Sequence, residues 1–293
     1  MAKKTRIPEN SKYALSGNSK KCPAVTTPHV VEPKYPAAAD RYVNLGQFYD
    51  VAALKKSRPD VLHYTDAVSA AYQRAYRALG AARQMSDSAS ALMREGLDAG
   101  KLLRRTDGII GRELRGKGSG GADALRFLGS LTCQGPVWRF DSVQALCPKV
   151  YQLQDAYGLA APMLQRLHAA AAARGFRAVI CPDPEHPEII QHLLLPELGL
   201  AFVTSREGMA YTGPAYRRVR LDAMVDTACA KRFKARLRFS SRVAAALRDE
   251  GLDALREAKA AHDQLEAVYH PHVDFAGVQQ LAQEELARIE SCL

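Results

Sequence analysis

The stretch KVYQLQDAYGLAAPMLQRLHAAAA, residues 149–172, decides how the centre of this chain folds. Residues 149–153 are predicted as a β-strand, and the alanine-rich residues 159–174 are predicted as a helix. Two more strands are predicted at 176–181 and 197–205, where apolar residues are concentrated. A strand, a helix and a strand in this order form a βαβ unit, which places parallel strands in one sheet.

Long helices are predicted on both sides of this α/β region. Apolar residues spaced three or four positions apart run over residues 61–85 and again over residues 233–265. This spacing is the periodicity of a long amphipathic helix. Between the two helical parts, the apolar runs 125–131 and 136–140 flank the sequence TCQG and predict a β-hairpin.

The two helical parts are related by an internal repeat with a constant offset of 176 residues. One register that holds over about 70 positions is hard to obtain by chance even in an alanine-rich chain, so we infer a duplication. The α/β region precedes the second copy, whereas only residues 1–36 precede the first, and we expect that the first copy lacks its own core. In each copy an aspartate, Asp98 or Asp274, is predicted to cap the last helix. Matching pairs include Val43 and Val219, Asp50 and Asp226, Ala82 and Ala258, Asp98 and Asp274, and Arg112 and Arg288.

The composition is that of a globular protein with a basic surface. The chain has 293 residues, and 41 Lys plus Arg against 31 Asp plus Glu give a net charge of +10. Hydrophobic residues make up 47% of the chain, which excludes wholesale disorder. No apolar run reaches the roughly 18 residues that a membrane helix needs, and we expect no secretory signal and no membrane association. The six cysteines lack zinc-binding or redox spacing, so we expect reduced thiols in a cytoplasmic protein.

The turn QDAYGLAAPML, residues 154–164, lies where a phosphate-binding loop would be placed. A P-loop follows a strand and opens a helix, so that amides at the helix N-terminus surround a phosphate. Together with four other strings, this turn resembles a duplicated P-loop NTPase-like family of poorly characterised ATPases or ATP-binding proteins. The resemblance covers most of the chain after residue 25 and implies a hairpin, a P-loop core and a long helical arm in each half. The strings are TTPHVVEPKYP (26–36), YVNLGQFYD (42–50), CPDPEHPEIIQHLLLPELGLAFVTS (181–205) and AKAAHDQLEAVYHPHVDF (258–275).

The turn departs from the family's pattern at the positions that carry its chemistry. Gly158 is followed by Leu159, Ala160, Ala161 and Pro162, so the lysine and the hydroxyl that would contact phosphate and Mg²⁺ are missing. Thr204 stands where the resemblance implies an aspartate. We therefore expect a tight strand-to-helix connection with no catalytic residue, and weak residual nucleotide binding is the alternative. The residues that could retain such binding are Gln154, Asp155, Gly158, Ala160, Ala161, Thr204 and Ser205.

Two further motifs have both a functional and a structural interpretation. GRELRGKGS, residues 111–119, is close to a P-loop in spelling, but it follows a helix and precedes a strand, so we interpret it as a linker. CPDPEHPE, residues 181–188, carries three prolines and is predicted as a loop, with metal binding as the alternative. Its possible ligands are Asp183, Glu185, His186 and Glu188.

A basic segment of the last long helix is the candidate for nucleic-acid binding. KRFKARLRFSSR, residues 231–242, holds six cations and no acid, interleaved with two phenylalanines. Such a helix could lie along a phosphate backbone. The alternative is a solvated helix face, which Lys55, Lys56 and Arg58 at the equivalent positions of the first copy favour. The six cations are Lys231, Arg232, Lys234, Arg236, Arg238 and Arg242.

The sequence thus predicts an α/β fold in which a small P-loop NTPase-like parallel-sheet core is flanked by two long helical-hairpin arms. We expect an irregular basic arm at 1–36, a helical arm at 37–115, the core at 124–215 and a second helical arm at 216–293. The leading hypothesis is a degenerate, non-catalytic interaction or scaffold protein without a cofactor, which binds a protein partner or self-associates through its arms. The alternatives are an ATP-binding protein or ATPase that uses ATP with Mg²⁺, and a nucleic-acid-binding module.

Overall fold

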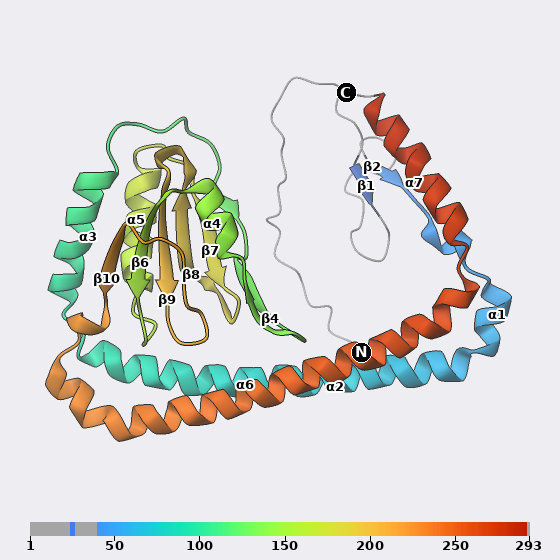
Figure 1. Ribbon diagram of the computed structural model, residues 1–293, viewed down its shortest axis with the longest axis horizontal. Helices are drawn as coiled ribbons and strands as arrows, with labels where there is room; N and C mark the ends of the chain where they lie inside the picture. The colour runs from blue at the N-terminus through green and yellow to red at the C-terminus, as the bar shows by residue number, and fades with distance from the viewer. Residues whose placement is uncertain (1–23, 27–39, 292–293) are drawn as a thin grey trace, which may run out of the picture. The chain divides into compact units, whose positions relative to one another are not determined.

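The computed structural model (Figure 1) describes residues 24–26 and 40–291. The chain forms two units, one made of residues 1–62 with 264–293 and the other of residues His63–Asp263. The basic arm predicted at 1–36 lies almost entirely outside the described residues. Among the described residues, no helix combines the length and the apolar character needed to cross a membrane.

The larger unit contains a six-stranded, mostly parallel sheet with the strand order β10-β6-β9-β8-β7-β3. Neighbouring strands are parallel except on the two sides of β8, which runs antiparallel to both β9 and β7. The α/β class and a largely parallel sheet are therefore confirmed. The strands are β3 (Ala124–Leu125), β6 (Lys149–Gln154), β7 (Val179–Asp183), β8 (His186–Leu195), β9 (Leu200–Ser205) and β10 (Arg217–Arg220).

Helices cover both faces of this sheet (Figure 1). Leu153 and Phe202 point to the face on which α3 and α5 lie. Val150 and Val203 point to the other face, where α4 packs. Because side chains alternate along a strand, the two faces form separate hydrophobic clusters. The helices are α3 (Ala99–Glu113), α4 (Phe140–Leu146) and α5 (Ala161–Ala172).

The long helices α2 (Arg58–Glu95) and α6 (Thr227–Tyr269), which the apolar periodicity predicts, pack antiparallel within the larger unit (Figure 1). Their contact surface consists largely of small residues, which let the two backbones approach closely. A Cβ added at Gly251 of α6 would lie 2.6 Å from Cδ2 of Leu79 of α2, so this position has no room for a side chain. The small buried residues are Ala71, Ala75, Ala78 and Ala82 in α2 and Ser240, Ala244, Gly251, Ala254 and Ala258 in α6.

The smaller unit is built from the ends of the chain. β1 (Ala24–Thr26) and β2 (Asp40–Tyr42) pair in parallel. The short helix α1 (Val51–Lys56) follows and is capped by the Asp50 side chain, while α7 (Phe275–Glu290) is capped by Asp274. The caps predicted at Asp98 for α3 and at Asp274 for α7 are both confirmed.

The same backbone junction is built once in each unit, at positions that the 176-residue offset relates. In the larger unit, the amide of Asp98 donates to the carbonyl of Met224 at 2.9 Å, and the amide of Asp226 donates to the carbonyl of Gly96 at 2.8 Å. In the smaller unit, the residues displaced by 176 positions form the same two bonds. These bonds are Asp274 to Phe48 and Asp50 to His272, both at 2.8 Å.

Two predictions about strands are wrong in part. The predicted hairpin exists, but its strands are β4 (Gly129–Thr132) and β5 (Gly135–Trp138). The segment 181–188, predicted as a loop, is the end of β7, a tight turn and the start of β8. Pro182 and Pro184 are tolerated because Pro182 lies at an irregularity in the strand pairing and Pro184 lies in the turn, where no ladder hydrogen bond is needed.

Gly80 and Gly251 provide a matched test of the helix packing. Gly80→Ala should stabilise the protein by about 0.5–1 kcal/mol, because nothing lies within 4 Å of the added Cβ and alanine favours a helix. Gly251→Ala has the same gain in helix propensity but must displace Leu79, so it should be less stable than Gly80→Ala by about 1–3 kcal/mol. Chemical denaturation measures both variants, and equal stabilities would contradict the close packing.

Candidate functional site

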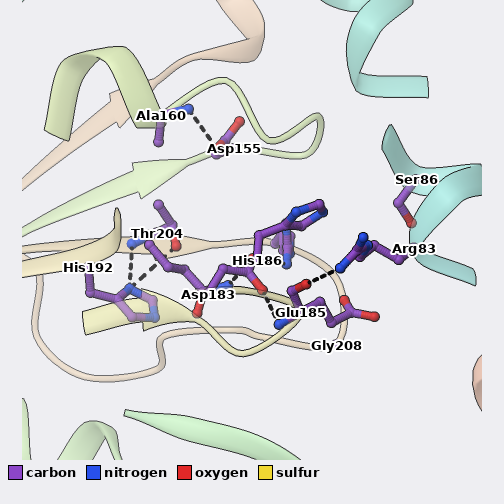
Figure 2. A network of polar contacts seen from close by, with 12 residues as sticks. Arg83, Ser86, Asp155, Ala160, Asp183, Glu185, His186, His192, Thr204 and Gly208 are labelled. Atoms are coloured by element: carbon purple, nitrogen blue, oxygen red, sulfur yellow. Dashed lines mark hydrogen bonds and ion pairs between the residues drawn. The ribbon is translucent and has the colours of Figure 1, made fainter. Parts of the chain in front are cut away.

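The turn between β6 and α5 is held by a carboxyl group of the chain itself. Asp155 follows the last residue of β6, and Gly158 takes the left-handed conformation with a φ of 70°. The Asp155 side chain accepts a hydrogen bond from the amide of Leu159 at 2.6 Å. It also accepts one from the amide of Ala160 at 2.9 Å (Figure 2). These amides directly precede α5, in the strand-to-helix loop where a P-loop has its phosphate donors.

Asp155 is buried, with 4% of its surface exposed. Burial raises the pKa of its carboxyl group, and the hydrogen bonds from Leu159 and Ala160 and the positive charge of Arg206 oppose this rise. The backbone of Asp155 is also fixed, because its amide donates to the carbonyl of Ser205 at 3.1 Å. The carboxyl group is therefore a structural part of the turn.

The helix pair covers the turn from outside. Leu159 is only 1% exposed and forms a hydrophobic cluster with Met93 at the end of α2 and Val225 just before α6. Tyr157 of the turn and Phe233 of α6 pack against the same cluster. The turn is thus held from inside by the Asp155 carboxyl group and covered from outside by side chains of the helices.

The amide and the hydroxyl of Thr204 contact His192 and not the turn. Its amide donates to Nδ1 of His192 at 3.1 Å, and its hydroxyl lies 3.3 Å from the same nitrogen (Figure 2). His192 is fully buried, and burial lowers the pKa of its imidazole to about 3, so the ring is neutral at physiological pH. Since Nδ1 accepts the amide hydrogen bond, the ring proton lies on Nε2.

The structure brings most of the predicted nucleotide-site residues together without forming a phosphate cradle. Gln154, Asp155, Gly158, Ala160 and Ala161 lie on the one turn, and Ser205 is paired in register with Gln154. The Ser205 hydroxyl accepts hydrogen bonds from Gln152 and from the amide of Tyr211, both at 3.1 Å. Sequence reasoning did not identify the role of Asp155, although a carboxylate four residues before a helix's first amides is a recognisable signal.

The motif GRELRGKGS lies, as expected, between a helix and a strand. The helix α3 ends at Glu113, and the following segment leads to β3. The amides of Gly118 and Gly120 donate to the carbonyls of Arg174 and Gly175, both at 2.9 Å. A Cβ at Gly118 would lie 2.3 Å from the Gly175 carbonyl oxygen, so the glycine permits this close backbone contact.

The motif CPDPEHPE forms the tip of the β7–β8 hairpin, and we name residues 183–188 the hairpin clip because they bind the helix pair (Figure 2). Asp183 stabilises the clip from inside, since its carboxylate accepts from the amide of Glu185 at 2.9 Å and from Gln191 at 2.7 Å. Arg206 lies 3.3 Å from the same carboxylate. The Asp183 side chain is therefore used for internal contacts of the sheet.

Two other charged groups of the hairpin clip, Glu185 and His186, contact the two long helices, whereas Glu188 lies 3.2 Å from His186 within the hairpin. Arg83 of α2 donates to the carbonyl of Glu185 at 2.9 Å, and Arg248 of α6 lies 3.4 Å from the Glu185 carboxylate. His186 Nε2 lies 2.9 Å from the carboxylate of Asp87 of α2. The residue types that suggested metal ligands in the sequence thus attach the sheet to the helices, and the helix partners were not identifiable from sequence alone.

The basic segment of α6 lies on the outer side of the helix. Its six cations, Lys231, Arg232, Lys234, Arg236, Arg238 and Arg242, are all exposed. Phe233 and Leu237 are half-buried, and Ser240 and Ala244 are buried on the inner side. The second phenylalanine, Phe239, is 56% exposed and lies among the cations.

Comparison of the chain with protein-family models, with curated proteins and with solved structures found no match.

Removal of the Asp155 side chain tests its role in the turn. Asp155→Ala leaves two amide donors without their acceptor, so it should lower the free energy of unfolding by about 2–4 kcal/mol. Asp155→Asn keeps one acceptor oxygen and should lose less. Urea denaturation measures both variants, and an unchanged stability of Asp155→Ala would contradict a structural role.

The raised pKa of Asp155 predicts how the stability of the protein depends on pH. Because burial raises the folded-state pKa of Asp155, its contribution to stability is fully present below the ordinary aspartate pKa of about 3.9 and is lost as the pH rises through the folded-state pKa. The side-chain amide of the Asp155→Asn variant does not titrate, so the stability of the wild type relative to this variant should fall as the pH rises above about 4. An unfolding series over pH measures this difference, and a difference that grows with pH would contradict the raised pKa.

We expect Arg83 and Arg248 to stabilise the hairpin clip locally. The double variant Arg83→Met, Arg248→Met removes the contacts of both helices with Glu185, so amide hydrogen exchange should accelerate in residues 183–190 and stay unchanged in β6 and β9. Arg256→Met is the matched control, because Arg256 pairs with Asp253 on its own helix. Equal effects of the double variant and the control would show that the clip does not depend on these contacts.

Proposed function

We propose that this chain is a non-catalytic interaction protein of the cytoplasm, with a degenerate P-loop NTPase-like core and long helical arms. The observation that most strongly supports this proposal is the pair of hydrogen bonds from Leu159 and Ala160 to Asp155. A carboxyl group takes the place that a phosphate would need. A nucleotide could use these amides only if it displaced a buried side chain.

The residues around the turn also lack the groups that phosphoryl transfer requires. A working site needs a cation on the β- and γ-phosphates and oxygen ligands for Mg²⁺. The positions after Gly158 are Leu159, Ala160, Ala161 and Pro162, and Leu159 and Ala160 are buried. Thr204, where the resemblance implies an aspartate, is bonded to His192. These observations favour a core that has kept a P-loop-like connection and lost its chemistry.

The helical arms support a role in binding a protein partner or a second copy of this chain. The helices α2 and α6 have 38 and 43 residues, which correspond to roughly 57 Å and 65 Å of helix. Beside α2 and α6 there is a cavity of about 590 Å³, lined by Tyr72, Tyr76 and Leu255 and by the β4–β5 hairpin. Tyr72 and Tyr76 stack with ring centroids 5.9 Å apart and are exposed, and tyrosines in such positions are frequent anchors of protein interfaces.

Free thiols in the core are compatible with the proposed cytoplasmic location. Cys147 and Cys181 are buried and unpaired. Burial raises the pKa of Cys147 to about 11 and that of Cys181 to about 12, so both remain protonated thiols at neutral pH. Unpaired thiols are typical of a reducing compartment.

A thermal-shift titration with Mg-ATP distinguishes this proposal from the ATPase alternative. We expect no change in melting temperature at millimolar Mg-ATP compared with Mg²⁺ alone, and no release of inorganic phosphate. A bound ligand at 100 times its Kd would stabilise the protein by about 2.7 kcal/mol, which is a rise of several degrees. A saturable rise with Mg-ATP would overturn the non-catalytic assignment and favour an ATP-binding protein.

A further inference from the structure

The outer side of α6 carries a concentration of positive charge that neither the fold nor the closed turn requires. Between Asp226 and Asp249 the chain has no acidic residue. We name the exposed cations of this stretch, together with Phe239, the basic face. It consists of Lys231, Arg232, Lys234, Arg236, Arg238, Arg242 and Phe239.

The basic face lies on a rigid stretch of helix. The inner side of α6 is fixed at the same level, because Phe233 and Leu237 pack against the cluster that contains Met93 of α2, and Ser240 and Ala244 are buried. At a rise of 1.5 Å per residue, the cations from Lys231 to Arg242 span roughly 16 Å along the helix. The backbone positions of these residues are therefore fixed before any partner binds.

The charges of the basic face are not neutralised by the described part of the chain. None of its six cations lies in an ion pair there, although other cations of α6 do. Arg248 pairs with Glu185, Arg256 with Asp253, and Lys259 with Asp263. The acids of α6 all follow residue 248, so the helix has a basic first half and an acidic second half.

Comparison of the two repeat copies shows that a solvated helix does not need this many cations. Both copies have cations at the first three positions, Lys55, Lys56 and Arg58 in the first and Lys231, Arg232 and Lys234 in the second. The copies then differ. The first has Asp60, Leu62, His63 and Asp66 where the second has Arg236, Arg238, Phe239 and Arg242. A solvated helix thus tolerates acids at these positions, and the extra cations with their exposed aromatic ring belong to the second copy alone.

We propose that the basic face binds single-stranded nucleic acid, with its cations on the phosphates and Phe239 stacked on a base. A row of cations with an exposed aromatic ring is the arrangement that binds single strands without sequence preference. Phe239 is 56% exposed between Arg238 and Arg242, so a base could reach its ring while the backbone contacts the arginines. This inference is independent of whether the turn at Asp155 binds nucleotide.

The helix pairing argues against direct reading of a duplex. A helix with its side chains is about 10–12 Å wide and already fills the major groove of DNA, which is about 12 Å wide. The helix α6 is packed against α2 along its inner side, so the pair is too thick to enter the groove. On a duplex the basic face could only contact phosphates, and Phe239 would find no unstacked base.

The helix pairing also argues against insertion into a membrane surface. An interfacial helix buries its apolar side between lipids. The apolar side of α6 is already used against α2 and the turn through Phe233 and Leu237. Binding to anionic lipid is therefore an outcome that the test must be able to detect, and it would oppose the proposal.

The experiment measures binding of a fluorescent single-stranded oligonucleotide by anisotropy over a range of salt concentrations. We expect affinity to fall with salt with a slope of about −0.7 for each phosphate contacted. Arg236→Asp with Arg242→Asp introduces the acids that the first copy has at these positions, so the helix should stay folded. This double variant should reduce the slope by about 1.4 or more and weaken binding at least about 10-fold.

Phe239 provides the second arm of the test. Phe239→Ala should weaken single-strand binding about 10-fold with little change in the salt slope, and Phe239→Tyr should restore it. Neither variant should change binding to a duplex of the same length. Lys55→Glu with Lys56→Glu is the matched control in the first copy and should leave binding unchanged.

Several results would overturn the proposal. They are no salt-dependent binding by the wild type, an equal loss in the Lys55→Glu, Lys56→Glu control, or no effect of Arg236→Asp with Arg242→Asp. Retained binding by Phe239→Ala would overturn the single-strand assignment. Binding to vesicles that contain phosphatidylserine without binding to the oligonucleotide would assign the basic face to a lipid surface instead.

Discussion

The hydrogen bonds from two amides at the start of α5 to the Asp155 carboxyl group connect the main parts of the larger unit. They end β6, fix the turn and begin the helix that covers one face of the sheet. The same turn places Leu159 in the cluster with Met93 and Val225, where the two long helices meet. A buried acceptor for these amides thus supports the sheet, the helix and the base of the arms together.

The internal repeat adds a second constraint, because the two copies share their backbone hydrogen bonds more than their surface residues. Both junctions form the same pair of amide hydrogen bonds, and both use aspartate caps. Within the helix pair, equivalent positions of the two copies even face each other, since Arg74 Nε lies 3.2 Å from the carboxylate of Glu250. An antiparallel pair of repeated helices is self-complementary in this way. The surface residues of the two copies differ, and the basic face exists in one copy only.

Much of this architecture could be predicted from sequence because it depends on local patterns. The strand from Lys149, the long amphipathic helices and the caps at Asp98 and Asp274 follow from periodicity and cap residues. The strand β8 was missed because prolines at a turn and at an irregular pairing suggest a loop. The contacts of the hairpin clip could not be predicted, since they depend on which distant residues the fold brings together, such as Arg83 and Arg248. The role of Asp155 is local, since its partners Leu159 and Ala160 follow four and five residues later, and this spacing is the signal that could have revealed it.

The central claim is that the amides at the start of α5 are permanently bonded to Asp155 and closed to nucleotides. Hydrogen exchange of the Leu159 and Ala160 amides, resolved by nuclear magnetic resonance with and without Mg-ATP, tests it most directly. The account predicts slow exchange of both amides in the free protein and no change when Mg-ATP is added. Rapid exchange in the free protein that becomes slow with Mg-ATP would show that the turn is an open phosphate site, and would contradict the account.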